Sequence, residues 1–302
     1  MKNQRLGAVF SAFLAAAFYA LNIPLSKLLL NDVPATVMAA FLYLGAGVGV
    51  GILYCFRRKH EDKKEWLTKK DLPYTVGMII LDIAAPIFLM MGIRMGTASN
   101  ASLLGNFEIV ATMFISLVFF HEKISRKLWG ASALITLSSI ILSFEGTDSL
   151  RFSYGSLFVL LATCCWGLEN NCTRSISDKS TYEIVTLKGL FSGLGSLCVG
   201  LLTGERLPAA GFLLRAMLLG FVAYGLSIFL YIRAQRHLGA AKTSAYYAVT
   251  PFIGAFLSFI LVGDKLTWLF AAALLVMTAG TALVVSDTLP AHGEKKKQTG
   301  SV

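Results

Sequence analysis

Residues 14–27 read LAAAFYALNIPLSK, and residues 161–174 read LATCCWGLENNCTR. The second stretch aligns with the first at an offset of 147 residues, and the aligned pairs are Tyr19 with Trp166, Asn22 with Glu169 and Lys27 with Arg174. A second match follows in the same order at an offset of 142, where HEKIS at 121–125 aligns with GDKLT at 263–267. Because the matches recur in order, they indicate an internal repeat of about half the chain.

The composition places this repeat in a membrane. Of the 302 residues, 56% are hydrophobic and 15% are charged, and the mean hydropathy is +0.67. An ordinary soluble domain carries about 25% charged residues. The net charge of +10 could point to nucleic acid, but the basic residues cluster in short gaps between apolar runs, as they do in membrane proteins. We therefore expect the lipid bilayer as a partner and no nucleic acid.

Ten apolar runs are long enough to span a bilayer, which takes roughly 20 residues: 6–29, 35–56, 72–94, 97–120, 128–144, 154–174, 181–203, 211–233, 240–262 and 267–286. We expect helices, since every backbone polar group in lipid must be paired within its own segment. Five spans per repeat is an odd number, so the second copy enters the membrane from the opposite side. The predicted fold is all-α: ten transmembrane helices in two inverted five-helix repeats, 1–150 and 151–290, followed by a disordered basic tail, 291–302.

The lysine and arginine residues predict the orientation. With the N-terminus inside, twenty of them fall on the inner side and six on the outer side, and Lys188 is left within a helix. Positive charge prefers the cytoplasmic side. We expect a multi-pass protein of the plasma (inner) membrane with both termini cytoplasmic.

Three paired motifs carry a resemblance to a known family. Each repeat opens with an Ala-rich helix that holds an aromatic and a small residue, Tyr19-Ala20 and Trp166-Gly167, and each ends its fourth helix in an acidic-Lys turn. On these motifs nearly the whole chain resembles the drug/metabolite transporter superfamily, in its ten-helix, two-repeat EamA branch. The family's Glu-Pro pair is split here, because repeat one has Glu108-Ile109 and repeat two has Thr250-Pro251. The resemblance implies a metabolite carrier, often an exporter, with a central cavity between the halves.

Charged groups inside the spans are the strongest functional candidates, because they are costly in a membrane. For Asp82 and Glu108 we weigh substrate or proton binding against a hydrogen-bonded tie between helices. For Glu169 and Lys188 we weigh an ion pair, or extension of Lys188 to the inner surface, against a substrate role. Glu108 also lies on an i, i+4 row with Asn100, Leu104 and Thr112.

Polar and aromatic residues at similar depth complete the predicted substrate site. Tyr19 and Asn22 form a stripe on the first span, and Tyr246, Tyr247 and Thr250 continue the row in the ninth. The predicted substrate-binding residues are Tyr19, Asn22, Asp82, Asn100, Glu108, Trp166, Glu169, Asn170, Lys188, Tyr246, Tyr247 and Thr250.

These features favour a secondary transporter that exports a small metabolite, such as an amino acid or a small organic cation, by alternating access. Acidic groups beside Tyr and Trp suit an ammonium group. Proton coupling and a homodimer are left open. We expect no enzyme activity, catalytic residue, metal or cofactor, since the sequence has no nucleotide-binding loop, HExxH or GxSxG motif. The alternatives are a non-transporting scaffold or flippase accessory subunit and, less favoured, a membrane-embedded lipid enzyme.

Overall fold

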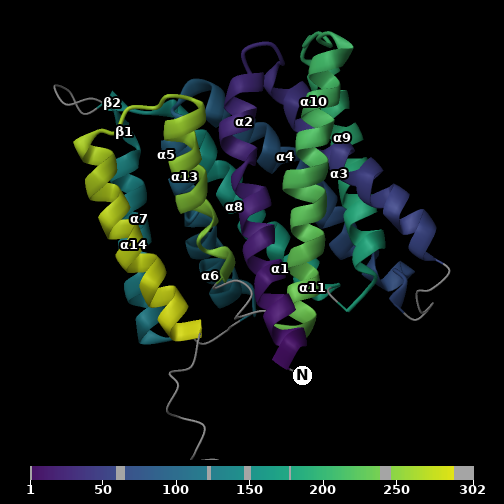
Figure 1. Ribbon diagram of the computed structural model, residues 1–302, viewed down its shortest axis with the longest axis horizontal. Coiled ribbons are helices and arrows are strands. Elements are labelled where there is room, and N and C mark those ends of the chain that lie inside the picture. Colours follow the sequence, from purple (N-terminus) through teal and green to yellow (C-terminus); the bar gives the residue numbers. More distant parts are fainter. Residues whose placement is uncertain are drawn as a thin grey trace, which may run out of the picture.

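The computed structural model describes residues 2–58, 65–120, 124–145, 151–176, 178–238 and 246–288, and Figure 1 shows their helices side by side in one bundle. The helices and strands are α1 Lys2–Ala20, α2 Asn22–Leu29, α3 Ala35–Arg57, η3 Lys69–Asp71, α4 Leu72–Met95, α5 Ala98–Leu104, α6 Phe107–Phe120, α7 Arg126–Leu142, β1 Phe144–Glu145, β2 Arg151–Phe152, α8 Tyr154–Ser175, α9 Thr181–Leu202, α10 Ala210–Gly220, η4 Phe221–Leu226, α11 Ser227–Leu238, α13 Thr250–Leu261 and α14 Trp268–Thr288.

The described chain is helical apart from one short strand pair, which confirms the all-α class. β1 and β2 pair antiparallel over two residues each, with Phe144 opposite Phe152, a detail that the apolar pattern did not predict. Six helical stretches in the described residues are long and apolar enough to cross a membrane, so the chain is a multi-pass membrane protein. The count of ten crossings, the inverted repeats and the side of the termini stay predictions, and the predicted disordered tail lies outside the described residues.

Helices from the first and second halves of the chain pack against each other throughout the bundle. α3 packs on α9, α4 on α8, α7 on α14, α1 on α11, and α5 on α13. Small residues allow the closest of these contacts: a Cβ atom added at Gly189 of α9 would lie 2.3 Å from the Gly47 nitrogen of α3. The glycine-rich stretch of α3 is therefore a packing surface.

Several helices are interrupted about halfway along. α1 and α2 are separated at Leu21, α5 and α6 at Gly105–Asn106, and α10 continues into a π-helical turn, η4. Pro24 explains the first break, because it has no N–H to bond the carbonyl four residues earlier. The continuous helix expected over 97–120 is thus wrong at its centre, and the row from Asn100 to Thr112 does not run along one helix.

The interruptions lie between the two ends of the bundle. We call the end that holds the start of α1 the N-terminal end, and the other, which holds the α2–α3, α4–α5 and α13–α14 connections, the opposite end (Figure 1). α1 and α6 run between the breaks and the N-terminal end, whereas α2, α5 and α13 run between the breaks and the opposite end.

Candidate functional site

Three charged side chains from three helices meet in the bundle interior. The Lys188 Nζ of α9 donates a hydrogen bond to Glu169 Oε1 of α8 at 2.9 Å, and it lies 3.0 Å from Asp82 Oδ2 of α4. All three residues are buried, with 0% exposure for Asp82, 3% for Glu169 and 8% for Lys188. The predicted pairing of Glu169 with Lys188 is confirmed, and Lys188 does not extend to the membrane surface. We call these residues the ion triad.

The surroundings of the ion triad fix its two carboxylates differently. Thr173 donates a hydrogen bond to Glu169, and Tyr43 Oη donates one to Asp82 Oδ1 at 2.8 Å. Asp82 Oδ2 is close to Lys188, but the angle is not that of a hydrogen bond, so this oxygen accepts none. One carboxylate oxygen therefore has electrostatic stabilisation from Lys188 without a donor in line with it.

Glu108 and Asn170 form a second polar pair beside the triad. Asn170 Nδ2 of α8 donates a hydrogen bond of 2.6 Å to Glu108 Oε1, in the first turn of α6. Both side chains are half-buried, unlike the triad. The close approach of α8 to α6 makes the contact possible, because a Cβ at Gly167 would lie 2.8 Å from the Ala111 Cβ. Glu108 is thus the acidic group of this centre that keeps some accessible surface.

Five tyrosine rings connect the two polar groups, and we call them the tyrosine row. The centroid distances are 5.1 Å for Tyr43–Tyr224, 5.6 Å for Tyr19–Tyr224, 5.9 Å for Tyr19–Tyr247 and 5.0 Å for Tyr231–Tyr247. Asn22 Nδ2 donates a hydrogen bond to Tyr224 Oη at 3.0 Å. Tyr19 and Tyr247 are close enough to Glu108 to interact with it electrostatically. The row thus joins the buried acids to the half-buried one through packed rings.

The other predicted residues lie apart or are occupied by the chain itself. Trp166 is buried in the apolar core. Tyr246 packs on Phe13 with ring centroids 5.2 Å apart, and Thr250 donates its hydroxyl to the Tyr247 carbonyl. In the described part of the chain, none of these three side chains is hydrogen-bonded to the ion triad or to Glu108.

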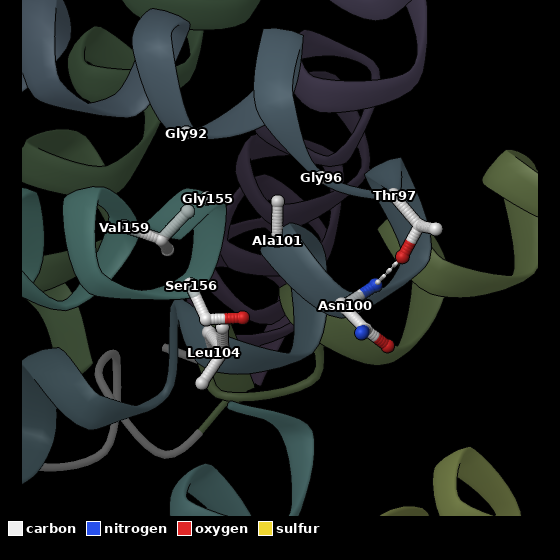
Figure 2. A pocket seen from close by; sticks show the side chains of 9 residues that line it. All are labelled: Gly92, Gly96, Thr97, Asn100, Ala101, Leu104, Gly155, Ser156 and Val159. Carbon is white, nitrogen blue, oxygen red and sulfur yellow. Dashed lines mark hydrogen bonds between the residues drawn. The ribbon is translucent and has the colours of Figure 1, made fainter. Parts of the chain in front are cut away.

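Asn100 lies towards the opposite end, in the first turn of α5. It lines a narrow gap between α4, α5 and α8, together with Thr97 and Ser156, that leaves no room for a ligand, and Figure 2 shows its backbone nitrogen bonded to the Thr97 hydroxyl. The break at Gly105–Asn106 separates Asn100 from Glu108. The two do not form the continuous polar row that the sequence suggested.

Sequence reasoning missed Tyr43, which binds Asp82, and left Tyr224 out of the site. Tyr43 lies one turn before Gly47, on the face of α3 that packs against α9, so its spacing from that glycine is a signal that could have placed it inside. Tyr224 lies in η4, where the wider helical turn brings its hydroxyl to Asn22. A π-helical turn often marks a functional position, but its place is not readable from residue types.

Comparison with known proteins identifies the class of molecule that holds this centre. The sequence model of the EamA-like transporter family matches residues 6–144 and again residues 153–286. The chain belongs to this family. The protein is therefore a membrane transporter, and the charged centre lies inside an EamA-like transporter.

Individual relatives of this EamA-like transporter are distant. An "Uncharacterized transporter" of Methanothermobacter thermautotrophicus is 23% identical over 300 residues, covering 93% of this chain and 87% of that protein. "Uncharacterized transporter YyaM" of Bacillus subtilis is 22% identical over 244 residues, 76% of each chain. A solved crystal structure with 16% identity superposes with a TM-score of 0.68 over 95% of this chain and 99% of its own. That likeness concerns the fold alone.

The centre of this EamA-like transporter combines charged, polar and aromatic groups. Its described charged groups are three carboxylates and one ammonium, beside tyrosine faces that attract cations. In the described residues no group of three or more His, Cys, Asp or Glu side chains is arranged to hold a metal ion. The centre therefore offers hydrogen bonds, negative charge and aromatic faces.

Proposed function

We propose that this transporter is a secondary carrier that exports a small metabolite bearing an ammonium group, an amino acid or a small organic cation, by alternating access. Glu108 binds the ammonium, Asn170 orients the Glu108 carboxylate, and Tyr19 and Tyr247 contact the cargo with their rings. The observation that carries the proposal is the half-buried Glu108 carboxylate, hydrogen-bonded to Asn170 beside the buried ion triad.

The balance of charge supports a cationic partner. In formal charges, Asp82, Glu108 and Glu169 contribute three negative charges and Lys188 one positive charge. Excess negative charge away from water is unfavourable, because the low-dielectric surroundings do not screen it. A cargo cation at Glu108, or a proton taken up there when the cargo leaves, offsets part of this excess. Exchange of the two at one carboxylate would couple export to proton entry.

The architecture supports alternating access. The same family model matches both halves, and the packing of α4 on α8 has a counterpart with the halves exchanged, α11 on α1. Inverted repeats of secondary transporters hold their substrate near the midplane, at interrupted helices. Glu108, Tyr19 and Tyr247 all adjoin such interruptions here.

Thermal stability with a ligand panel tests the proposal. Purified protein is melted with amines, amino acids, organic anions and nucleosides. A ligand that binds the folded state at 100 times its Kd stabilises that state by about 2.7 kcal/mol, so we expect the amine-bearing class to raise the melting temperature of the wild type and to do so far less in Glu108→Gln. Asp287→Asn, an exposed change in the last turn of α14, is the matched control and should respond like the wild type.

Flux into proteoliposomes distinguishes the alternatives. The stabilising ligand should cross the bilayer faster in vesicles that contain the wild type, and a pH gradient should change its rate if protons exchange with it. Stabilisation by organic anions instead of amines would contradict the assigned substrate class. Binding without any flux would favour the scaffold or accessory-subunit reading, and chemical conversion of a lipid would favour the enzyme.

A further inference from the structure

The three half-helices at the opposite end close on one another. α2, α5 and α13 are mutually packed, and a Cβ at Gly254 of α13 would lie 3.0 Å from Ser102 Oγ of α5 and 3.4 Å from the Ala20 carbonyl at the end of α1. No comparable packing joins α1 to α6 among the described residues. These described helices thus close the opposite end of the bundle.

The half-buried groups lie on the side of the breaks that faces the N-terminal end. Glu108 follows the break in its helix and Tyr19 precedes the break in its own, so both adjoin segments that run to the N-terminal end. Tyr247 precedes the start of α13 and lies on the same side. The structure therefore corresponds to a state in which the site is closed from the opposite end.

One side chain from the second half of the chain fastens this closed end. Asp264 lies in the α13–α14 connection, next to Gly263 with its φ of +76°, and its Oδ2 accepts a hydrogen bond of 2.7 Å from the backbone nitrogen of Ser99 in the first turn of α5. Thr97 caps the neighbouring donor, Asn100 N. A carboxylate at a helix N-terminus gains from both the N–H group and the helix dipole.

A chemically similar contact nearby joins two helices that are already packed together. Glu205, in the α9–α10 connection, accepts hydrogen bonds from Thr36 N at 3.2 Å and Val37 N at 2.9 Å at the start of α3. α3 and α9, however, pack along much of their length, with backbones in contact at Gly47 and Gly189. Glu205 therefore joins two helices that stay together whatever happens at α5.

We propose that Asp264 is the latch of the opposite end: its carboxylate holds the α13–α14 connection on α5 while the site faces the N-terminal end, and the contact breaks when the opposite end opens. This proposal rests on the transport function proposed above. It goes beyond that function because it assigns a conformational role to a residue outside the substrate site. Losing the carboxylate weakens the closed state and leaves the site residues unchanged.

Distance measurement between two spin labels tests the latch. The five native cysteines are replaced, and cysteines for labelling are placed at Asp32, exposed in the α2–α3 connection, and at Leu266, 67% exposed in the α13–α14 connection. The labelled protein is reconstituted in lipid nanodiscs. We expect Asp264→Ala to raise the ratio of long to short distances about tenfold, the size expected for one charge-assisted hydrogen bond.

Matched variants make the result decisive. Asp264→Asn keeps a neutral acceptor and should shift the distances in the same direction by less, and Glu205→Ala should leave them as in the wild type. A wild-type distribution in folded Asp264→Ala, checked by its melting curve, would overturn the latch, and so would an equal shift in Glu205→Ala. Because this readout needs no substrate, a flat ligand panel would count against the proposed function and not against the latch.

Discussion

Lys188 holds the interior of the transporter together through one ammonium group placed between two carboxylates. The acids come from α4 and α8 and the lysine from α9, so a single side chain joins three helices. Such a buried cluster is weak evidence for net stability, since desolvation opposes the attraction. It does, however, make the three groups interdependent, because removal of one partner leaves the others charged and unpaired.

Lys188→Met should therefore be strongly destabilising. The change keeps most of the length of the side chain and removes its charge, which leaves Asp82 and Glu169 as uncompensated neighbours. We expect a loss of about 3–5 kcal/mol, measured as a lower melting temperature in detergent. Lys70→Met, at an exposed position before α4, controls for the loss of a lysine and should change little. Equal melting of the Lys188 variant and the wild type would show that the triad is not ionised as drawn.

At the scale of the element, close helix packing depends on individual glycines, which have no Cβ atom. A Cβ at Gly189 would meet backbone atoms of α3 at 2.3 Å, whereas a Cβ at Gly130 in α7 would meet only the Leu283 side chain, at 3.7 Å. Backbone atoms of a packed helix cannot move aside, whereas the end of a flexible side chain can. The same substitution should thus have opposite effects at the two positions.

We expect Gly189→Ala to lower stability by about 1–3 kcal/mol through overpacking. Gly130→Ala should raise stability by up to about 1 kcal/mol, because alanine is the better helix former. Melting curves of both variants in the same detergent measure the difference. Stabilisation by Gly189→Ala would contradict the close contact of α3 with α9.

The helices were predictable from the sequence and most of their interruptions were not. Apolar runs place α3, α4 and α9 to within a residue or two, because lipid requires a continuous helix of that length. The break before α6 has no proline within it, and it depends on contacts such as that of Asn106 with Thr281 of α14. Pro251 lies in the first turn of α13, directly after the turn at 248–249 that interrupts the helix.

For the whole molecule, the orientation in the membrane is the prediction that most needs a direct measurement. A membrane-impermeant maleimide is added to cells that express cysteine-free protein with one cysteine returned. From the distribution of lysine and arginine, Leu266→Cys should react in intact cells. Asp178→Cys, at the N-terminal end with its side chain 74% exposed, should react only after permeabilisation. The reverse pattern would place the termini outside.

The contacts of the charged centre could be predicted from the sequence only in part. Glu169 and Lys188 lie in consecutive helices joined by a short connection, so their pairing followed from spacing along the chain. Asp82 reaches Lys188 from the other half of the sequence, and Glu108 reaches Asn170 in the same way. Such contacts depend on how the halves pack, which local residue patterns do not encode.

The residues of the ion triad are synthesised far apart in time, and this affects how their helices enter the membrane. Asp82 leaves the ribosome 106 residues before Lys188 (188 minus 82) and Glu169 leaves 19 before it. Each acid costs on the order of 2.5–3.5 kcal/mol when its helix enters lipid alone. Until α9 is synthesised, α4 and α8 must therefore wait near the translocon, other chains or the membrane surface. A nascent chain stopped before Lys188 carries two acids without their counter-ion, so its helices cannot reach the packing of the finished bundle.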